Sequence, residues 1–329
     1  MYAAILALFA LLLAAAQPPA TPAQESPAPQ PADKPAPAVK PRQRTGAEPV
    51  RLFYCTHSAG FRHDVLPETR EIMKKLGEDL DWLEVEVSDD ITDLDAAKLA
   101  TLDAVMLYTT GRLPLDTQML TDWVNAGGAL IGVHSATDTL ADDKIYVQKI
   151  GGTFDGHPWN EPVRIIIDGR GHYITDPFIA DGGDPNDELA TSFRIADEIY
   201  QFRTLNPDNV VLMHLDPATP KAEPGRAYPL AWIRQAGSGR IFYTALGHRP
   251  EVWRDQRFIQ HLLRGIEWAA ARCDQCNGPL DAVPIAYGLP VGDVKDWHDG
   301  GEAILGGCEV ENVTHHLGCN ACRKLRSSR

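Results

Sequence analysis

Residues 129–138 read ALIGVHSATD, and this stretch decides the fold that we expect. The unbroken apolar run ALIGV is typical of a strand buried on both faces, as in a parallel sheet covered by helices. Gly127 and Gly128 precede the run and end a helix expected over 116–125. His134 stands at the carboxyl end of the strand, where open α/β sheets bind their ligands. We therefore look for chemistry around His134.

The alternation of short apolar strands with amphipathic helices continues on both sides of this stretch. Further strands are expected at 50–56, 82–87, 103–110, 163–167, 210–214, 230–234 and 240–244. Further helices are expected at 67–80, 95–102 and 256–272. This pattern predicts an α/β domain over residues 50–272, with a mostly parallel sheet and helices on both faces.

The first 49 residues carry a different composition. Residues 1–16 hold an apolar run shorter than the roughly 20 residues that span a bilayer, which predicts a cleaved signal and an exported, periplasmic or extracellular protein. Because no Lys or Arg precedes the run, an uncleaved membrane tether stays open. Residues 17–49 are dense in Pro and Ala and predict a disordered linker.

The charge balance limits the partners. The formal net charge of −14 gives little basic surface for phosphate contacts, so a general nucleic-acid binder is excluded and a small-molecule ligand is expected. The sequence does not indicate an oligomeric state.

Five short motifs place polar side chains at expected loops. They are AGFRHD (59–64), GVHSATD (132–138), GHP (156–158), DEIY (197–200) and ALGH (245–248). Their order along the chain resembles that of the ThuA-like (trehalose utilisation) family. The resemblance implies a class I glutamine amidotransferase-like fold, in which the sheet is flavodoxin-like.

The same resemblance argues against amidotransferase chemistry. The nucleophilic Cys of those enzymes follows the central strand, whereas here the strand runs into His134 and Ser135. No G-x-S-x-G elbow surrounds Ser135, so it is expected to be a turn residue. The protein is therefore not expected to be a glutamine amidotransferase.

The motifs supply the candidate site residues. Imidazoles and carboxylates serve as acid–base groups or as ligands of a divalent metal, although a single His after a strand is often structural. The candidate catalytic residues are His134, Asp138, His157, Asp197, Glu198 and His248. The candidate substrate contacts are His63, Trp159, Tyr200 and Trp232, whose aromatic members could equally be core. The resemblance implies a saccharide-type ligand from trehalose or ketosugar catabolism, and the alternative is a non-catalytic saccharide-binding or scaffold protein.

Residues 273–329 form a Cys-rich tail. Cys273 and Cys276 make one CxxC pair and Cys319 and Cys322 another, which together predict a structural Zn²⁺ site. The stretch PIAYGLP (284–290) and a following GGC resemble small bacterial zinc-ribbon-like modules. Disulfides are the alternative in an exported protein.

Overall fold

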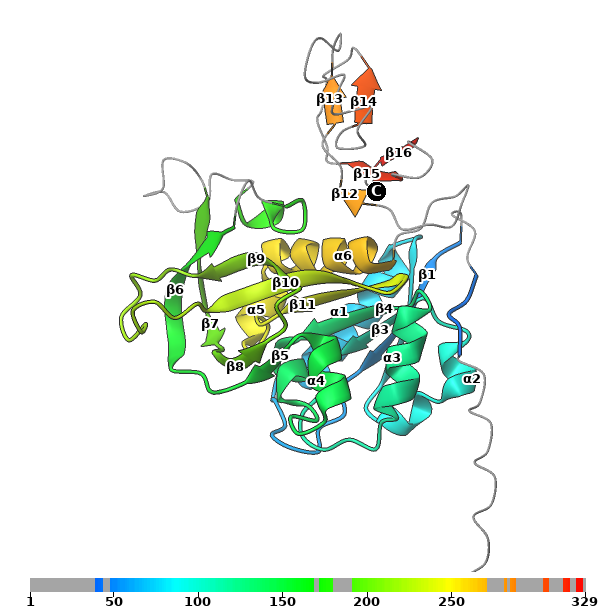
Figure 1. Cartoon of the computed structure of the whole chain (residues 1–329), viewed down its shortest axis with the longest axis horizontal. Helices are drawn as coiled ribbons and strands as arrows, with labels where there is room; N and C mark the ends of the chain where they lie inside the picture. The colour runs from blue at the N-terminus through cyan, green and yellow to red at the C-terminus, as the bar shows by residue number, and fades with distance from the viewer. Residues whose placement is uncertain are drawn as a thin grey trace, which may run out of the picture. The chain divides into compact units, whose positions relative to one another are not determined.

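The computed structural model describes residues 39–43, 48–168, 172–179 and 191–270, and the backbone of five short strands beyond residue 280 (Figure 1). The predicted signal segment 1–16 lies outside the described residues, as does most of the predicted linker. Within the described part, no helix is both long and apolar enough to cross a membrane.

Nine strands form the central sheet, in the order β2-β1-β3-β4-β11-β10-β9-β6-β7. The first five are mutually parallel. They are β2 (Leu83–Ser88), β1 (Val50–Cys55), β3 (Ala104–Leu107), β4 (Ala129–Val133) and β11 (Gly239–Thr244). Every residue of β3, β4 and β11 is buried, as expected for strands covered on both faces. The order confirms the predicted flavodoxin-like α/β fold.

Beyond β11 the sheet turns antiparallel. This half consists of β10 (Pro229–Ala236), β9 (Val210–Leu215), β6 (Trp159–Ile167) and β7 (Ser192–Ile199). A separate ribbon pairs β5 (Gly152–Phe154) with β8 (Phe202–Leu205). The sequence did not predict β7, so the Asp197 and Glu198 pair expected on a loop lies at the end of a strand.

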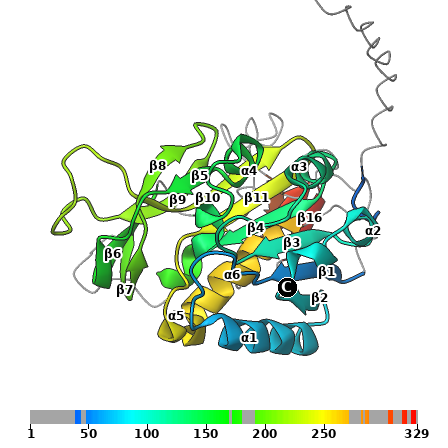
Figure 2. The ribbon, with the colours of Figure 1, turned by 90° about the horizontal axis from the view of Figure 1, so that it is seen from below.

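Helices cover both faces of the parallel half, as predicted (Figures 1 and 2). One face carries α1 (Leu66–Asp79), α5 (Pro250–Arg254) and α6 (Gln256–Ala270), and the other carries α3 (Thr117–Asn125) and α4 (Lys144–Ile150). The short elements are α2 (Ala96–Leu99) and the 3-10 helices η1 (Ile91–Asp93), η2 (His134–Asp138) and η3 (Asp176–Phe178). Asp116 and Asp143 cap α3 and α4 by accepting backbone N–H bonds of their first turns.

Three loops at the carboxyl ends of the parallel strands are bridged to one another. Ser58 pairs with Thr110, and Gly111 pairs with Thr139, so the loops after β1, β3 and β4 form one connected rim. Gly111 has a φ of 78°, and a Cβ there would lie 2.5 Å from the backbone N of Gly60. Only glycine allows the two loops to approach this closely.

Part of the predicted linker packs on the domain. The backbone N of Arg42 donates to the carbonyl of Leu102, and its guanidinium contacts Asp103 at 3.0 Å and the carbonyl of Pro49 at 2.9 Å. The folded unit therefore begins before the residue 50 that composition suggested.

The tail contains short paired strands. β12 (Asp281–Ala282), β15 (His316–Cys319) and β16 (Lys324–Ser327) form one sheet, and β13 (Ile285–Tyr287) pairs with β14 (Ile304–Gly307). Cys273, Cys276 and Cys322 lie outside the described residues, and only the backbone of Cys319 is described. The zinc site stays a prediction.

Candidate functional site

Four side chains converge at the carboxyl ends of the parallel strands. His63 follows β1, His134 follows β4, His248 follows β11 and Glu198 comes from β7. One ligand atom from each lies within 4.8 Å of the other three, and all except His248 are buried. We call this group the His–Glu cluster.

The hydrogen bond between His134 and the carbonyl of Ala245 determines which ring nitrogen faces the cluster. Its φ of 46° is rare for a non-glycine residue and turns the chain sharply after β4. Nδ1 lies 2.7 Å from the carbonyl oxygen of Ala245, and because a carbonyl only accepts, Nδ1 carries a hydrogen. In a neutral His134, Nε2 then has no hydrogen and carries a lone pair.

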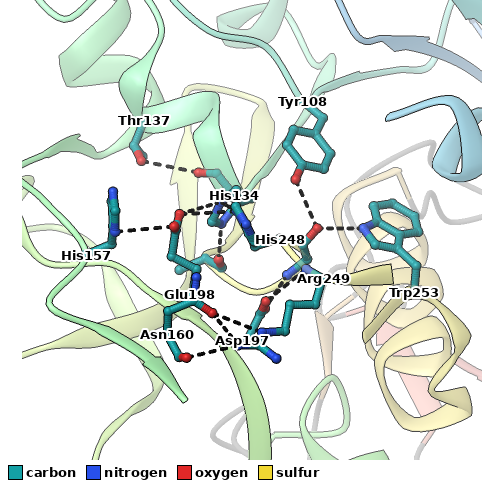
Figure 3. Close-up of polar contacts among 12 residues, drawn as sticks. Tyr108, His134, Thr137, His157, Asn160, Asp197, Glu198, His248, Arg249 and Trp253 are labelled. Atoms are coloured by element: carbon teal, nitrogen blue, oxygen red, sulfur yellow. Dashed lines mark hydrogen bonds and ion pairs between the residues drawn. The ribbon is translucent and has the colours of Figure 1, made fainter. Parts of the chain in front are cut away.

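Two other atoms that can carry lone pairs, one on Glu198 and one on His248, lie close to Nε2 of His134. Nε2 of His134 lies 3.4 Å from Oε2 of Glu198 and 3.3 Å from Nδ1 of His248 (Figure 3). Nδ1 of His248 lies 3.2 Å from the same Oε2. Three such atoms at these separations repel one another unless a proton or a metal ion lies among them.

Glu198 uses its two oxygens differently. Oε2 faces His134 and His248, whereas Oε1 lies 3.2 Å from Nδ1 of His157 (Figure 3). Burial raises the pKa of Glu198, but the contacts with His134 and His248 outweigh it, so the pKa falls well below its ordinary value. The carboxylate is ionised and gives the cluster its negative charge.

His63 completes the cluster as a neutral imidazole. Burial, together with the neighbouring His134 and His248, lowers the pKa of His63 to about 3. Its Nδ1 is buried and has no hydrogen-bond partner. An unpaired buried nitrogen costs free energy unless something binds it.

The donor set fits a divalent metal ion. Ligands about 2.1 Å from a tetrahedral ion lie about 3.4 Å from one another, which matches the 3.2 to 3.4 Å separations among His134, Glu198 and His248. Three imidazoles and a carboxylate are ligands that zinc takes in proteins.

Asp197 has a different role from its neighbour Glu198, because successive side chains of a strand point in opposite directions. Its carboxylate accepts the backbone N–H groups of Gly247 at 2.7 Å and Arg249 at 3.1 Å. Burial raises the pKa of Asp197. Asp197 thus holds the loop that carries His248 rather than lying in the cluster.

Aromatic side chains buttress the same region. Tyr200 is buried, and its ring centroid lies 4.1 Å from that of His134 and 4.3 Å from that of Phe154. His157 stacks on Phe154 at 5.9 Å, and its side chain is 50% exposed. His157 is therefore the solvent-facing imidazole beside the cluster.

The remaining candidates are not members of the cluster. Trp159 and Trp232 are fully buried, and their indole N–H groups donate to the carbonyls of Pro220 and Ile150, so both belong to the core and cannot stack on a substrate. Asp138 is half-buried at the end of η2, and burial raises its pKa. The hydroxyl of Ser135 is fully buried, which leaves no exposed serine nucleophile after β4.

The sequence motifs predict a substrate contact for His63 and group His157 with His134 and His248. The structure instead places His63 with the cluster and His157 at its edge. The signal that could have found His63 is its place after β1, since the carboxyl ends of parallel strands meet at one edge.

Comparisons with known proteins agree with this architecture. No protein with a curated description matches the chain. A ThuA-like protein from Bacteroides uniformis ATCC 8492 superposes with a TM-score of 0.56 at 20% identity, covering 72% of this chain and 97% of its own. A ThuA-like protein from Parabacteroides merdae ATCC 43184 superposes with a TM-score of 0.52 at 18% identity, covering 68% of this chain and 90% of its own. These likenesses show the fold. Residues 51–269, most of the chain, match the ThuA family, described as trehalose utilisation, and the chain therefore belongs to that family.

Proposed function

We propose that the protein is a metal-dependent enzyme acting on a sugar or sugar derivative, with the His–Glu cluster as its centre. The convergence of His63, His134, Glu198 and His248 carries this proposal. Family membership supports a role related to trehalose utilisation at the level of the family. The N-terminal apolar run supports export to the periplasm or the medium.

The cluster supports metal binding by its chemistry. His134, Glu198 and His248 present close-set donors, and His63 adds a buried nitrogen without a partner. A divalent ion held there would supply a Lewis acid that polarises a carbonyl or hydroxyl oxygen of the substrate. Zn²⁺ suits the imidazole-rich set best.

Neighbouring side chains are placed to handle the substrate. The side chain of His248 is 25% exposed and that of His157 is 50% exposed, so the cluster is reached from this side. Nδ1 of His157 lies 3.2 Å from Oε1 of Glu198, which leaves Nε2 to hydrogen-bond a substrate hydroxyl or to exchange a proton with it.

Metal titration of the full chain tests the centre. Zn²⁺ and Mn²⁺ binding is measured by calorimetry for the wild type and for His134→Ala, with His214→Ala as the matched control. His214 is a partly exposed imidazole paired with Asp168 at 2.9 Å on the other half of the sheet. We expect His134→Ala to weaken one Zn²⁺ equivalent by about 100-fold or more, and His214→Ala to leave it unchanged.

Turnover separates the enzyme from a binding protein. The same variants are incubated with 3-ketodisaccharides, and product is followed by chromatography. Turnover that disappears in His134→Ala supports the enzyme. Saccharide binding without turnover, unaffected by His134→Ala, would instead favour the non-catalytic saccharide-binding protein, and equal Zn²⁺ binding by wild type and His134→Ala would refute the metal centre.

A further inference from the structure

Phe61 is an exposed aromatic residue beside the His–Glu cluster. In the part of the chain that the structure describes, it is the one aromatic side chain among the exposed large hydrophobic residues, with 67% of its surface exposed. Its ring lies perpendicular to that of His63, with centroids 4.9 Å apart. Isolated exposed hydrophobic residues are ordinary on protein surfaces, so the position of Phe61 carries more weight than its exposure.

The backbone around Phe61 is firmly held. The N–H groups of Ala59 and Gly60 both donate to the carbonyl of Thr110, at 3.0 and 3.2 Å. The hydroxyl of Thr110 donates to the carbonyl of Phe61 at 2.8 Å. Because the backbone from Ala59 to Phe61 is hydrogen-bonded to Thr110, Phe61 is presented to solvent in a preorganised way, which reduces the cost of ordering a contact when a ligand binds.

Phe61 lies on the loop after β1, at an edge of the sheet where ligands are expected to bind. β1 and β3 are neighbours in the sheet, but the chain passes from β1 to β2 on one side before it crosses to β3 and β4 on the other. The strand order therefore switches direction between β1 and β3. Open α/β sheets bind ligands outside the carboxyl ends of strands at such a switch point. Phe61 follows β1 at that edge, and its loop is bridged to the loop after β3.

We propose that Phe61 is the platform on which a pyranose ring of the substrate stacks, a proposal that rests on the proposed sugar-directed function. The face of an aromatic ring is electronegative, and a pyranose face presents C–H groups that carry a small positive charge. The predicted stacking residues Trp159 and Trp232 are buried, whereas Phe61 offers its ring to solvent next to His63. The sugar would thus be held against the rim with one edge directed to the cluster.

Calorimetric titration of the Zn²⁺-treated full chain with trehalose and with glucose tests the platform. We expect Phe61→Ala to weaken trehalose binding by about tenfold, the effect of about 1.4 kcal/mol of aromatic contact. Phe61→Trp should retain or tighten binding. Val210→Ala is the matched control, because Val210 is 58% exposed on β9 away from the cluster, and it should leave binding unchanged.

Zn²⁺ titration of the same samples keeps the two proposals separate. Unchanged Zn²⁺ affinity in Phe61→Ala, together with weakened trehalose binding, supports the platform. Trehalose affinity equal to that of the wild type in Phe61→Ala overturns it, as does the absence of any trehalose or glucose binding by the wild type. A wild type that binds trehalose but not Zn²⁺ refutes the metal centre and leaves the Phe61 comparison valid.

Discussion

Asp197→Asn should lower both the stability of the domain and its affinity for Zn²⁺. The carboxylate accepts two backbone N–H groups of the loop that carries His248, one on each oxygen. An amide has one oxygen, so one of the N–H groups of Gly247 and Arg249 is left facing an NH₂ group in a buried place.

The expected loss in the free energy of unfolding follows from the two hydrogen bonds of Asp197 and from the burial of its carboxylate. A hydrogen bond to a charged acceptor contributes about 1.5 to 3 kcal/mol, and a buried unpaired donor costs about 1 to 3 kcal/mol. Burial raises the pKa of Asp197, so the neutral amide recovers part of the desolvation cost of the carboxylate. We expect a net loss of about 2 kcal/mol, or about 4 to 8 °C in Tm for a domain of this size.

Thermal unfolding and Zn²⁺ calorimetry check this expectation. Zn²⁺ affinity should fall because the loop no longer holds His248 in place. Asp155→Asn serves as the control, since that carboxylate is exposed, contacts Arg226 and should change stability by less than about 0.5 kcal/mol. A Tm for Asp197→Asn within 1 °C of wild type, with equal Zn²⁺ affinity, would refute the positioning role.

Three shorter predictions concern other parts of the chain. Burial lowers the pKa of His261 to about 4 from its usual 6.5, so the unfolded chain binds the extra proton and stability is lost as the pH falls through this window. Between pH 7 and pH 4 this histidine should lower the free energy of unfolding of the wild type by about 3 kcal/mol. Urea unfolding at the two pH values should show a smaller decrease for His261→Gln than for the wild type. Gly265→Ala places a Cβ 2.1 Å from the ring of Phe242 and should lower the free energy of unfolding by about 1 to 3 kcal/mol in urea titrations. Metal analysis of the tail should find one Zn²⁺ per chain that disappears in Cys273→Ser, whereas cysteines that resist alkylation without zinc would favour disulfides.

The central strands of the parallel half can be predicted from the sequence because they are buried on both faces. ALIGV in β4 is a continuous apolar segment, and the middle of β11 carries the apolar run Ile241, Phe242 and Tyr243, so both stand out from the polar loops around them. His134 could be placed for the same reason, since it follows β4 directly. The resemblance to the ThuA-like family then added the remaining motifs in order.

The antiparallel half was harder because its strands mix polar and apolar residues. β7 reads SFRIADEI, in which Arg194, Asp197 and Glu198 interrupt the apolar pattern, so the sequence does not predict the strand that supplies the cluster's carboxylate. The division of labour between Asp197 and Glu198 depends on which side of β7 each occupies, and one-dimensional spacing does not reveal this without the strand. Trp159 and Trp232 looked like stacking residues by type alone, and only their burial excludes that role.

The contacts of Arg42 determine where the chain enters the domain. Arg42 bonds to Leu102 and Asp103, which immediately precede β3, whereas the His–Glu cluster lies beyond the opposite, carboxyl ends of the strands. The point of attachment and the reactive edge are therefore at opposite poles of the sheet.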